Sequence, residues 1–170
     1  MTRLPSLALL LSLAACGGGD HGVASGTVGD GSGNSVAYVV KQEGDGTTTT
    51  VRSSDGSAVI RTGDATAAAA FPPGFALYPG AQVVSNMSVE SAGDASGAGA
   101  IVAFESADTP DRILAFYRAA AERAGYKVES EISAGAMAMI GGKREGDDHG
   151  FTLTVNRTAD KSEATLIGGR

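Results

Sequence analysis

Short β-prone runs separated by glycine-containing turns recur along this chain, and this pattern constrains its fold more than any other feature. Three such runs in the first half comprise residues 36–42, 47–53 and 57–62. The turns between them contain Asp-Gly pairs, which favour tight β-hairpins. The sequence therefore predicts a β-meander over residues 36–63. Its threonine-rich second run, which includes Thr47 and Thr50, is polar on both faces and offers little surface to bury.

The second half repeats the pattern with more apolar residues. Its predicted strands comprise residues 82–89, 99–106, 126–132, 136–143, 150–157 and 163–168. A glycine-rich turn over 91–98 joins the first two. Alternation is clearest at Phe151, Leu153 and Val155, as in a strand with one buried face. These runs predict an antiparallel sheet.

One segment between these strands has helical rather than strand periodicity. Thr109 and Pro110 form a helix start, and Gly125 ends the pattern. Apolar residues recur at spacings of three and four, at Ile113, Phe116, Tyr117, Ala120, Ala121 and Ala124. The order of elements predicts an α+β fold, in which one main helix packs on an antiparallel sheet whose other face meets the meander.

Composition shifts divide the chain into five parts. The predicted parts are a cleaved signal peptide (1–15), a lipidated flexible linker (16–35), the β-meander (36–63), an Ala/Pro-rich connector (64–80) and the α+β domain (81–170). The linker is rich in glycine and serine, which favours a disordered leash. Large apolar residues of the connector, from Phe71 to Tyr78, either wrap the core or form an exposed binding lip, and the core is the commoner fate.

Residues 1–15 have the parts of a secretory signal: a basic Arg3, an apolar core and small residues before a cut site. The apolar core is about half the ~20 residues that span a hydrocarbon layer, so cleavage is favoured over a transmembrane helix. The run Leu13-Ala14-Ala15-Cys16 resembles the lipobox of bacterial lipoproteins. That resemblance implies cleavage before Cys16 and acylation of its thiol, which would tether the domain to a membrane of the cell envelope.

The residue after the cysteine bears on location. In lipoproteins with this signal an aspartate there commonly marks inner-membrane retention, and this chain has Gly17. The resemblance thus implies the outer membrane, facing the periplasm. Cys16 is the single cysteine, so an intramolecular disulfide is excluded.

A second resemblance covers roughly residues 71–168. The pattern Tyr78-Pro79-Gly80-Ala81, then Phe116-Tyr117-Arg118 and Gly125-Tyr126, is similar to small uncharacterised envelope lipoproteins. It implies a compact exported α+β domain and brings no activity or cofactor. We expect none from the residues either, since Gly29–Asn34 lacks the strand and helix that flank a phosphate loop.

Charge and composition exclude some partners. The formal net charge is −6 and no long Lys/Arg cluster is present, which disfavours nucleic acid. Aromatic residues make up 5% of the chain and Trp is absent, so large stacking platforms are not expected. The expected partners are the membrane, through the lipid on Cys16, and another envelope protein.

The densest polar cluster, residues 143–149, is the one candidate for catalysis or metal binding. His149 could carry protons or bind a cation together with Asp147 or Asp148. Consecutive acids on a hairpin tip more often point into water. Met137 and Met139 share a strand face, where they fill core or line an adaptable pocket. The sequence therefore favours a lipid-anchored binding or structural module, with an envelope hydrolase or metal-dependent enzyme as the alternative.

Overall fold

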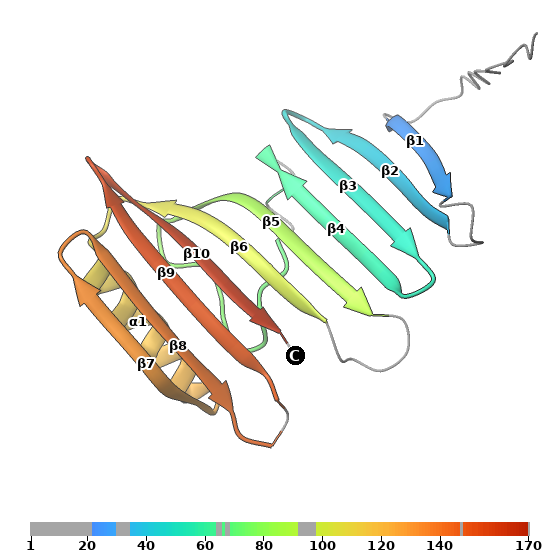
Figure 1. Cartoon of the computed structure of the whole chain (residues 1–170). Helices are drawn as coiled ribbons and strands as arrows, with labels where there is room; N and C mark the ends of the chain where they lie inside the picture. The colour runs from blue at the N-terminus through green and yellow to red at the C-terminus, as the bar shows by residue number, and fades with distance from the viewer. Residues whose placement is uncertain are drawn as a thin grey trace, which may run out of the picture.

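The computed structural model describes residues 22–29, 35–63, 66, 69–91, 98–146 and 148–169. These residues form ten strands and one helix, with the bounds β1 Gly22–Gly29, β2 Ser35–Glu43, β3 Gly46–Ser53, β4 Gly56–Thr62, β5 Gln82–Ser91, β6 Gly99–Ser106, α1 Pro110–Arg123, β7 Tyr126–Ala134, β8 Met137–Arg144, β9 Gly150–Thr158 and β10 Lys161–Gly169 (Figure 1).

All ten strands belong to one antiparallel sheet, in the order β1-β2-β3-β4-β5-β6-β10-β9-β8-β7 (Figure 1). The predicted α+β class is therefore wrong, and the fold is β-rich with a single short helix. The meander does not pack on a face of the second-half sheet. It extends that sheet sideways, because residues 56–62 of β4 pair with residues 85–91 of β5.

The individual strands of the meander are confirmed, since β2, β3 and β4 each lie within one residue of the predicted runs. The expected linker over 16–35 is wrong in part, because Gly22–Gly29 forms β1 and pairs with β2. The signal peptide and Cys16 lie outside the described residues. β1 is rich in Gly, Ser and Thr, so its strand character comes from pairing with β2 rather than from its own composition.

Helix α1 begins with Pro110 at its first turn and ends before Gly125, whose φ is +81°. Both ends agree with the sequence prediction. Its buried residues are Pro110, Ile113, Leu114, Tyr117, Ala120 and Ala121. They pack on β7, β8 and β9. The alanines lack bulk, and this brings the helix close to the sheet.

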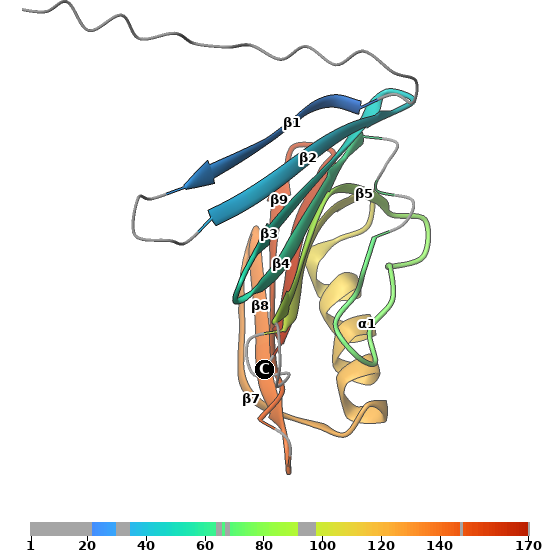
Figure 2. The ribbon, with the colours of Figure 1, turned by 90° about the vertical axis from the view of Figure 1, so that its right-hand side faces the viewer.

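The core lies on the α1 side of the sheet. Strands β6, β9 and β10 alternate between buried and more exposed residues along their length, and Phe104, Leu153 and Leu166 are almost fully buried on that side. The segment 69–81, which we call the strap, lies on the same side as α1 (Figure 2). It covers the sheet where the helix does not.

The strap contributes directly to the core. Phe75 and Tyr78 are 8% and 9% exposed, and the Phe75 ring lies 4.9 Å from that of Phe151 and 5.3 Å from that of Tyr126. The prediction that this segment wraps the core is confirmed for these two side chains. Within the described residues, no helix is long and apolar enough to cross a membrane.

Candidate functional site

A pocket of about 810 Å³ lies between the strap and the start of β5. Its lining residues are Gly63, Thr66, Ala69, Phe71, Leu77, Gln82, Val83 and Val84. Phe71, Leu77 and Val83 are partly buried and pack against the main core. The size and the mainly apolar lining, with a few polar groups, are typical of small-molecule sites. This strap pocket is the leading candidate site.

Thr66 fixes one wall of the pocket. Its hydroxyl lies 2.8 Å from the Gly63 carbonyl oxygen and 3.1 Å from that of Val83, and the residue is 8% exposed. The hydroxyl therefore connects the end of β4 with the start of β5. A wall held in this way is formed before any ligand arrives.

Asn86 on β5 holds the start of the strap. Its side chain accepts a hydrogen bond from the Ala70 N–H (3.1 Å) and donates to the Ala70 carbonyl (2.9 Å) and to the Ile101 carbonyl (3.2 Å). Asn86 is 1% exposed. A buried amide with three such partners satisfies backbone groups that would otherwise be costly to bury.

Two tyrosines hold the middle of the strap. The Tyr117 hydroxyl on α1 donates to the Ala76 carbonyl at 3.0 Å, and the Tyr126 hydroxyl on β7 donates to the Pro73 carbonyl at 3.2 Å. Burial raises the pKa of Tyr117 well above its usual range, so this hydroxyl stays protonated and keeps its donor. The strap is thus fastened from the sheet and from the helix.

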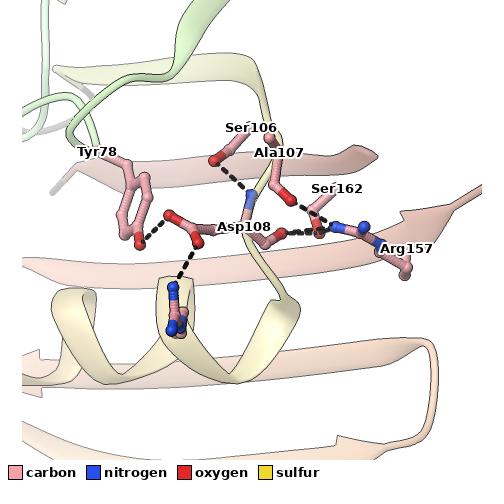
Figure 3. Close-up of polar contacts among 7 residues, drawn as sticks. Tyr78, Ser106, Ala107, Asp108, Arg157 and Ser162 are labelled. Carbon is pink, nitrogen blue, oxygen red and sulfur yellow. Dashed lines mark hydrogen bonds and ion pairs between the residues drawn. The ribbon is translucent and has the colours of Figure 1, made fainter. Parts of the chain in front are cut away.

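The end of the strap is fastened through Tyr78 to the start of α1 (Figure 3). The Tyr78 hydroxyl donates to the Asp108 carboxylate at 2.9 Å, and Arg112 forms an ion pair with the same carboxylate at 3.0 Å. These two donors lower the pKa of Asp108. Burial and the hydrogen bond to Asp108 raise the pKa of Tyr78.

The main chain at Asp108 is fixed by β9 and β10 (Figure 3). The Arg157 guanidinium donates to the carbonyls of Ala107 and Asp108, both at 2.9 Å, and the Ser162 hydroxyl donates to the Asp108 carbonyl at 2.6 Å. The carbonyls of Ala107 and Asp108 belong to the turn that leads into α1, and Arg157 also donates to the Asp160 carbonyl at 3.1 Å. The network therefore positions the helix and strap and leaves little capacity for acid–base chemistry.

A smaller pocket of about 400 Å³ lies over β7–β10. Its lining is rich in glycine, at Gly141, Gly142, Gly150, Gly168 and Gly169, with Glu129 and Lys143 also present. Packing explains most of these glycines. A Cβ on Gly142 would lie 2.3 Å from the Lys127 carbonyl oxygen, and one on Gly169 would lie 2.6 Å from that of Ala98. Close packing therefore accounts for most of these glycines without a ligand.

The polar cluster predicted as an alternative site lies at the β8–β9 hairpin turn. The His149 carbonyl accepts a hydrogen bond from the Arg144 N–H at 2.8 Å, and Asp148 is exposed with φ +56°. Asp147 and Cys16 lie outside the described residues. Where the chain is described, no group of three or more His, Cys, Asp or Glu residues could hold a metal ion.

The two methionines lie on the sheet face opposite α1, where Met137 is 41% exposed and Met139 is partly buried. They are outside the strap pocket. The sequence identified the pocket's apolar strap residues, Phe71 and Leu77, but not the opposing wall of Val83 and Val84. A bulge between Val83 and Ser85 shapes that wall, and it has no clear sequence signal.

A family model described as START domain-like matches residues 83–164, slightly less than half of the 170-residue chain. The match runs from β5 into β10 and includes α1, and of the residues that line the strap pocket it covers Val83 and Val84. Neither the curated proteins nor the solved structures contain a match. The likeness is compatible with a binding role for this half of the chain.

Proposed function

We propose that this protein is a ligand-binding module that takes a small apolar molecule into the strap pocket. The observation that carries the proposal is the pocket of about 810 Å³ lined by Phe71, Leu77 and Val83. Buried side chains fasten the strap on both sides of this pocket, so little ordering is required when a ligand binds. The START domain-like match over 83–164 supports a binding role.

The ligand class follows from the lining. The pocket offers apolar side chains with a side-chain amide at Gln82 and a hydroxyl at Thr66, and its lining has no charged residue among those described. An anion or cation would be desolvated there without a charged partner, which is costly. An uncharged, largely aliphatic or aromatic molecule with one polar end fits this chemistry best.

The uncharged apolar fluorophore N-phenyl-1-naphthylamine provides a direct test on the chain from residue 17 onward. We expect saturable binding that Leu77→Trp reduces, because the indole occupies pocket volume. Ile167→Trp is the matched control, since it places the same side chain on the opposite face of the sheet. Binding that is unchanged in the Leu77 variant, or equally reduced in both variants, would contradict the proposal.

The lipid anchor is the second part of the proposed function. The residues Leu13-Ala14-Ala15-Cys16 support cleavage before Cys16 and its acylation, with the domain held at the outer membrane and facing the periplasm. Five residues separate Cys16 from Gly22, the first residue of β1. The six residue steps from Cys16 to Gly22 span at most about 22 Å, so the sheet would lie near the lipid surface.

Metabolic labelling with an alkyne fatty acid tests the anchor. The wild-type chain should take up the label and fractionate with membranes, and Cys16→Ala should lose both properties. An unlabelled wild-type chain would exclude the anchor. Because the pocket test uses a chain without Cys16, the two parts of the proposal succeed or fail separately.

A further inference from the structure

The sheet face opposite α1 carries a charge-free band that crosses all ten strands. One cross-strand row of paired residues comprises Ala24, Val40, Thr49, Ile60, Met87, Ile101, Ile167, Thr152, Gly141 and Ser130. The neighbouring row comprises Gln42, Thr47, Thr62, Ser85, Ala103, Thr165, Thr154, Met139 and Ile132. Neither row contains Asp, Glu, Lys or Arg, although such residues make up 19% of the chain.

Large aliphatic side chains are exposed along this band. Ile60, Ile132 and Ile167 are 38%, 46% and 47% exposed, and Val28 and Val36 on the same face are 64% and 38% exposed. Figure 2 shows α1 and the strap together on the other side of the sheet. The open face of an antiparallel sheet usually carries polar and charged side chains. On this face Ile60, Met87, Ile101 and Ile167 are cross-strand neighbours on β4, β5, β6 and β10. Such a contiguous apolar stretch is typical of an interaction site.

The size of the band fits an interface between proteins. Ten strands at ~4.8 Å spacing and two residue rows along each strand give roughly 43 Å by 14 Å, or about 600 Å² on one copy. Two such faces together bury about 1,200 Å², the lower limit of a standard stable interface. The band is therefore large enough to hold a second folded protein.

We propose that the occupant is a second copy of this chain, packed face to face across the band. Two sheets with the same twist can pack in an aligned sandwich, and two copies of one sheet meet this condition automatically. A two-fold axis would place the band of one copy on the band of the other, as in most homodimers. The resulting dimer leaves both strap pockets on its outer sides.

A lipid surface fits the band less well. Glu105 and Glu163 lie opposite each other beside the band, and Lys161 forms ion pairs with both. At the rim of a dimer these charged groups keep their water, whereas they would lose it if the face entered a lipid surface. Strand β1 forms one edge of the sheet. Its unpaired backbone groups would lose their water in hydrocarbon, which is costly. These two features favour protein over lipid as the occupant.

Photocrosslinking in intact cells tests the proposal with the full chain. The photoreactive residue p-benzoylphenylalanine at position 60 or 167 should give an adduct at twice the mass of the monomer. The same residue at position 112 is the control, because the Arg112 side chain is 74% exposed and lies on α1. It should give no such adduct. Adducts only with lipid or with other proteins, or no adduct at positions 60 and 167, would overturn the proposal.

Co-purification of two differently tagged copies gives a second measurement. The double variant Ile60→Lys/Ile167→Lys should reduce recovery of the second tag at least about tenfold, because each buried ammonium loses its water without a partner. Glu122→Lys on the exposed side of α1 should leave recovery unchanged. Both replaced isoleucines are exposed in one copy, so the variant should keep its fold by circular dichroism. Unchanged recovery in the folded double variant would also overturn the proposal.

Discussion

Asn86 on β5 forms hydrogen bonds with both backbone groups of Ala70, 16 residues earlier in the chain. This pair fastens the start of the strap to the sheet beside the strap pocket. This buried amide couples the start of the strap to the sheet, and the pocket wall at that point depends on it. Substitutions at the fastening points should change stability and pocket binding together.

Asn86→Ala should lower the free energy of unfolding by about 1–3 kcal/mol, since the Ala70 N–H and carbonyl then lose their buried partner. Urea unfolding of the chain from residue 17 onward measures this. Hydrogen exchange at the Ala70 amide should also accelerate. Ser88→Ala, two residues along the same strand, is the control and should stay within about 0.5 kcal/mol. Equal losses for both variants would contradict a specific role for Asn86.

The sequence predicted local structure far better than long-range pairing. Periodicity and end signals located α1, and Asp-Gly turns located β2 to β4, because these features depend on neighbouring residues. The pairing of β4 with β5 joins residues on either side of the strap, and nothing in either strand specifies its partner. One sheet was therefore predicted as two units. The strap pocket was not predicted for the same reason, since its walls come from Leu77 and Val83 on different elements, and the strap was expected to wrap the core or form a lip.

The Tyr78–Asp108 pair predicts a dependence of stability on pH at both extremes. Hydrogen bonds from Tyr78 and Arg112 lower the pKa of Asp108 in the folded chain. The stability that Asp108 contributes is therefore present above the unfolded carboxyl pKa and is lost as pH falls through the lowered folded value. The pKa of Tyr78 is raised in the folded chain. The stability that Tyr78 contributes is therefore present below about pH 10 and is lost as pH rises through the raised folded value.

Tyr78→Phe tests both halves of this dependence. It removes the donor to Asp108, so the loss of stability between neutral and strongly acidic pH should become shallower than in the wild-type chain. The alkaline loss should also become shallower. Urea unfolding across the pH range measures the two slopes. Unchanged slopes at both extremes would show that the pair does not titrate with folding.

Tyr117→Phe should lower stability by about 1 kcal/mol, because the Ala76 carbonyl loses its hydroxyl donor while the ring stays in the core. Tyr117 is fully buried and its pKa is raised by that burial, so its phenol must be neutral in the folded chain. In the wild-type chain this phenol ionises on unfolding above about pH 10, which lowers stability there. The phenylalanine variant has no such phenol, so its free energy of unfolding should fall less than that of the wild type as pH rises above about 10. Thermal unfolding of both chains at neutral and alkaline pH measures this. The same difference in stability between variant and wild type at both pH values would contradict the prediction.

Gly168→Ala tests how closely the strap packs on β10. A Cβ at this position would lie 2.6 Å from the Pro72 Cβ, so the strap must move or the substitution costs about 1–3 kcal/mol through overpacking. Gly150→Ala is the matched control on the adjacent strand, where the nearest atom would be 3.7 Å away. It should change stability little. If the two variants behave alike, the strap does not lie against Gly168 as the structure has it.

Gly74→Ala and Gly80→Ala separate backbone strain from close packing within the strap. Both glycines have positive φ, +85° and +74°, so alanine carries a strain of about 1–2 kcal/mol at either position. A Cβ at Gly74 would also lie 2.3 Å from the Ala124 Cβ after α1, whereas one at Gly80 would have no neighbour within 4 Å. Gly74→Ala should therefore be the more destabilising by a further 1–3 kcal/mol or so. It should also weaken binding of N-phenyl-1-naphthylamine, because the displaced strap carries Phe71 and Leu77 with it. Equal stability of the two variants would mean that the strap is not held against the end of α1.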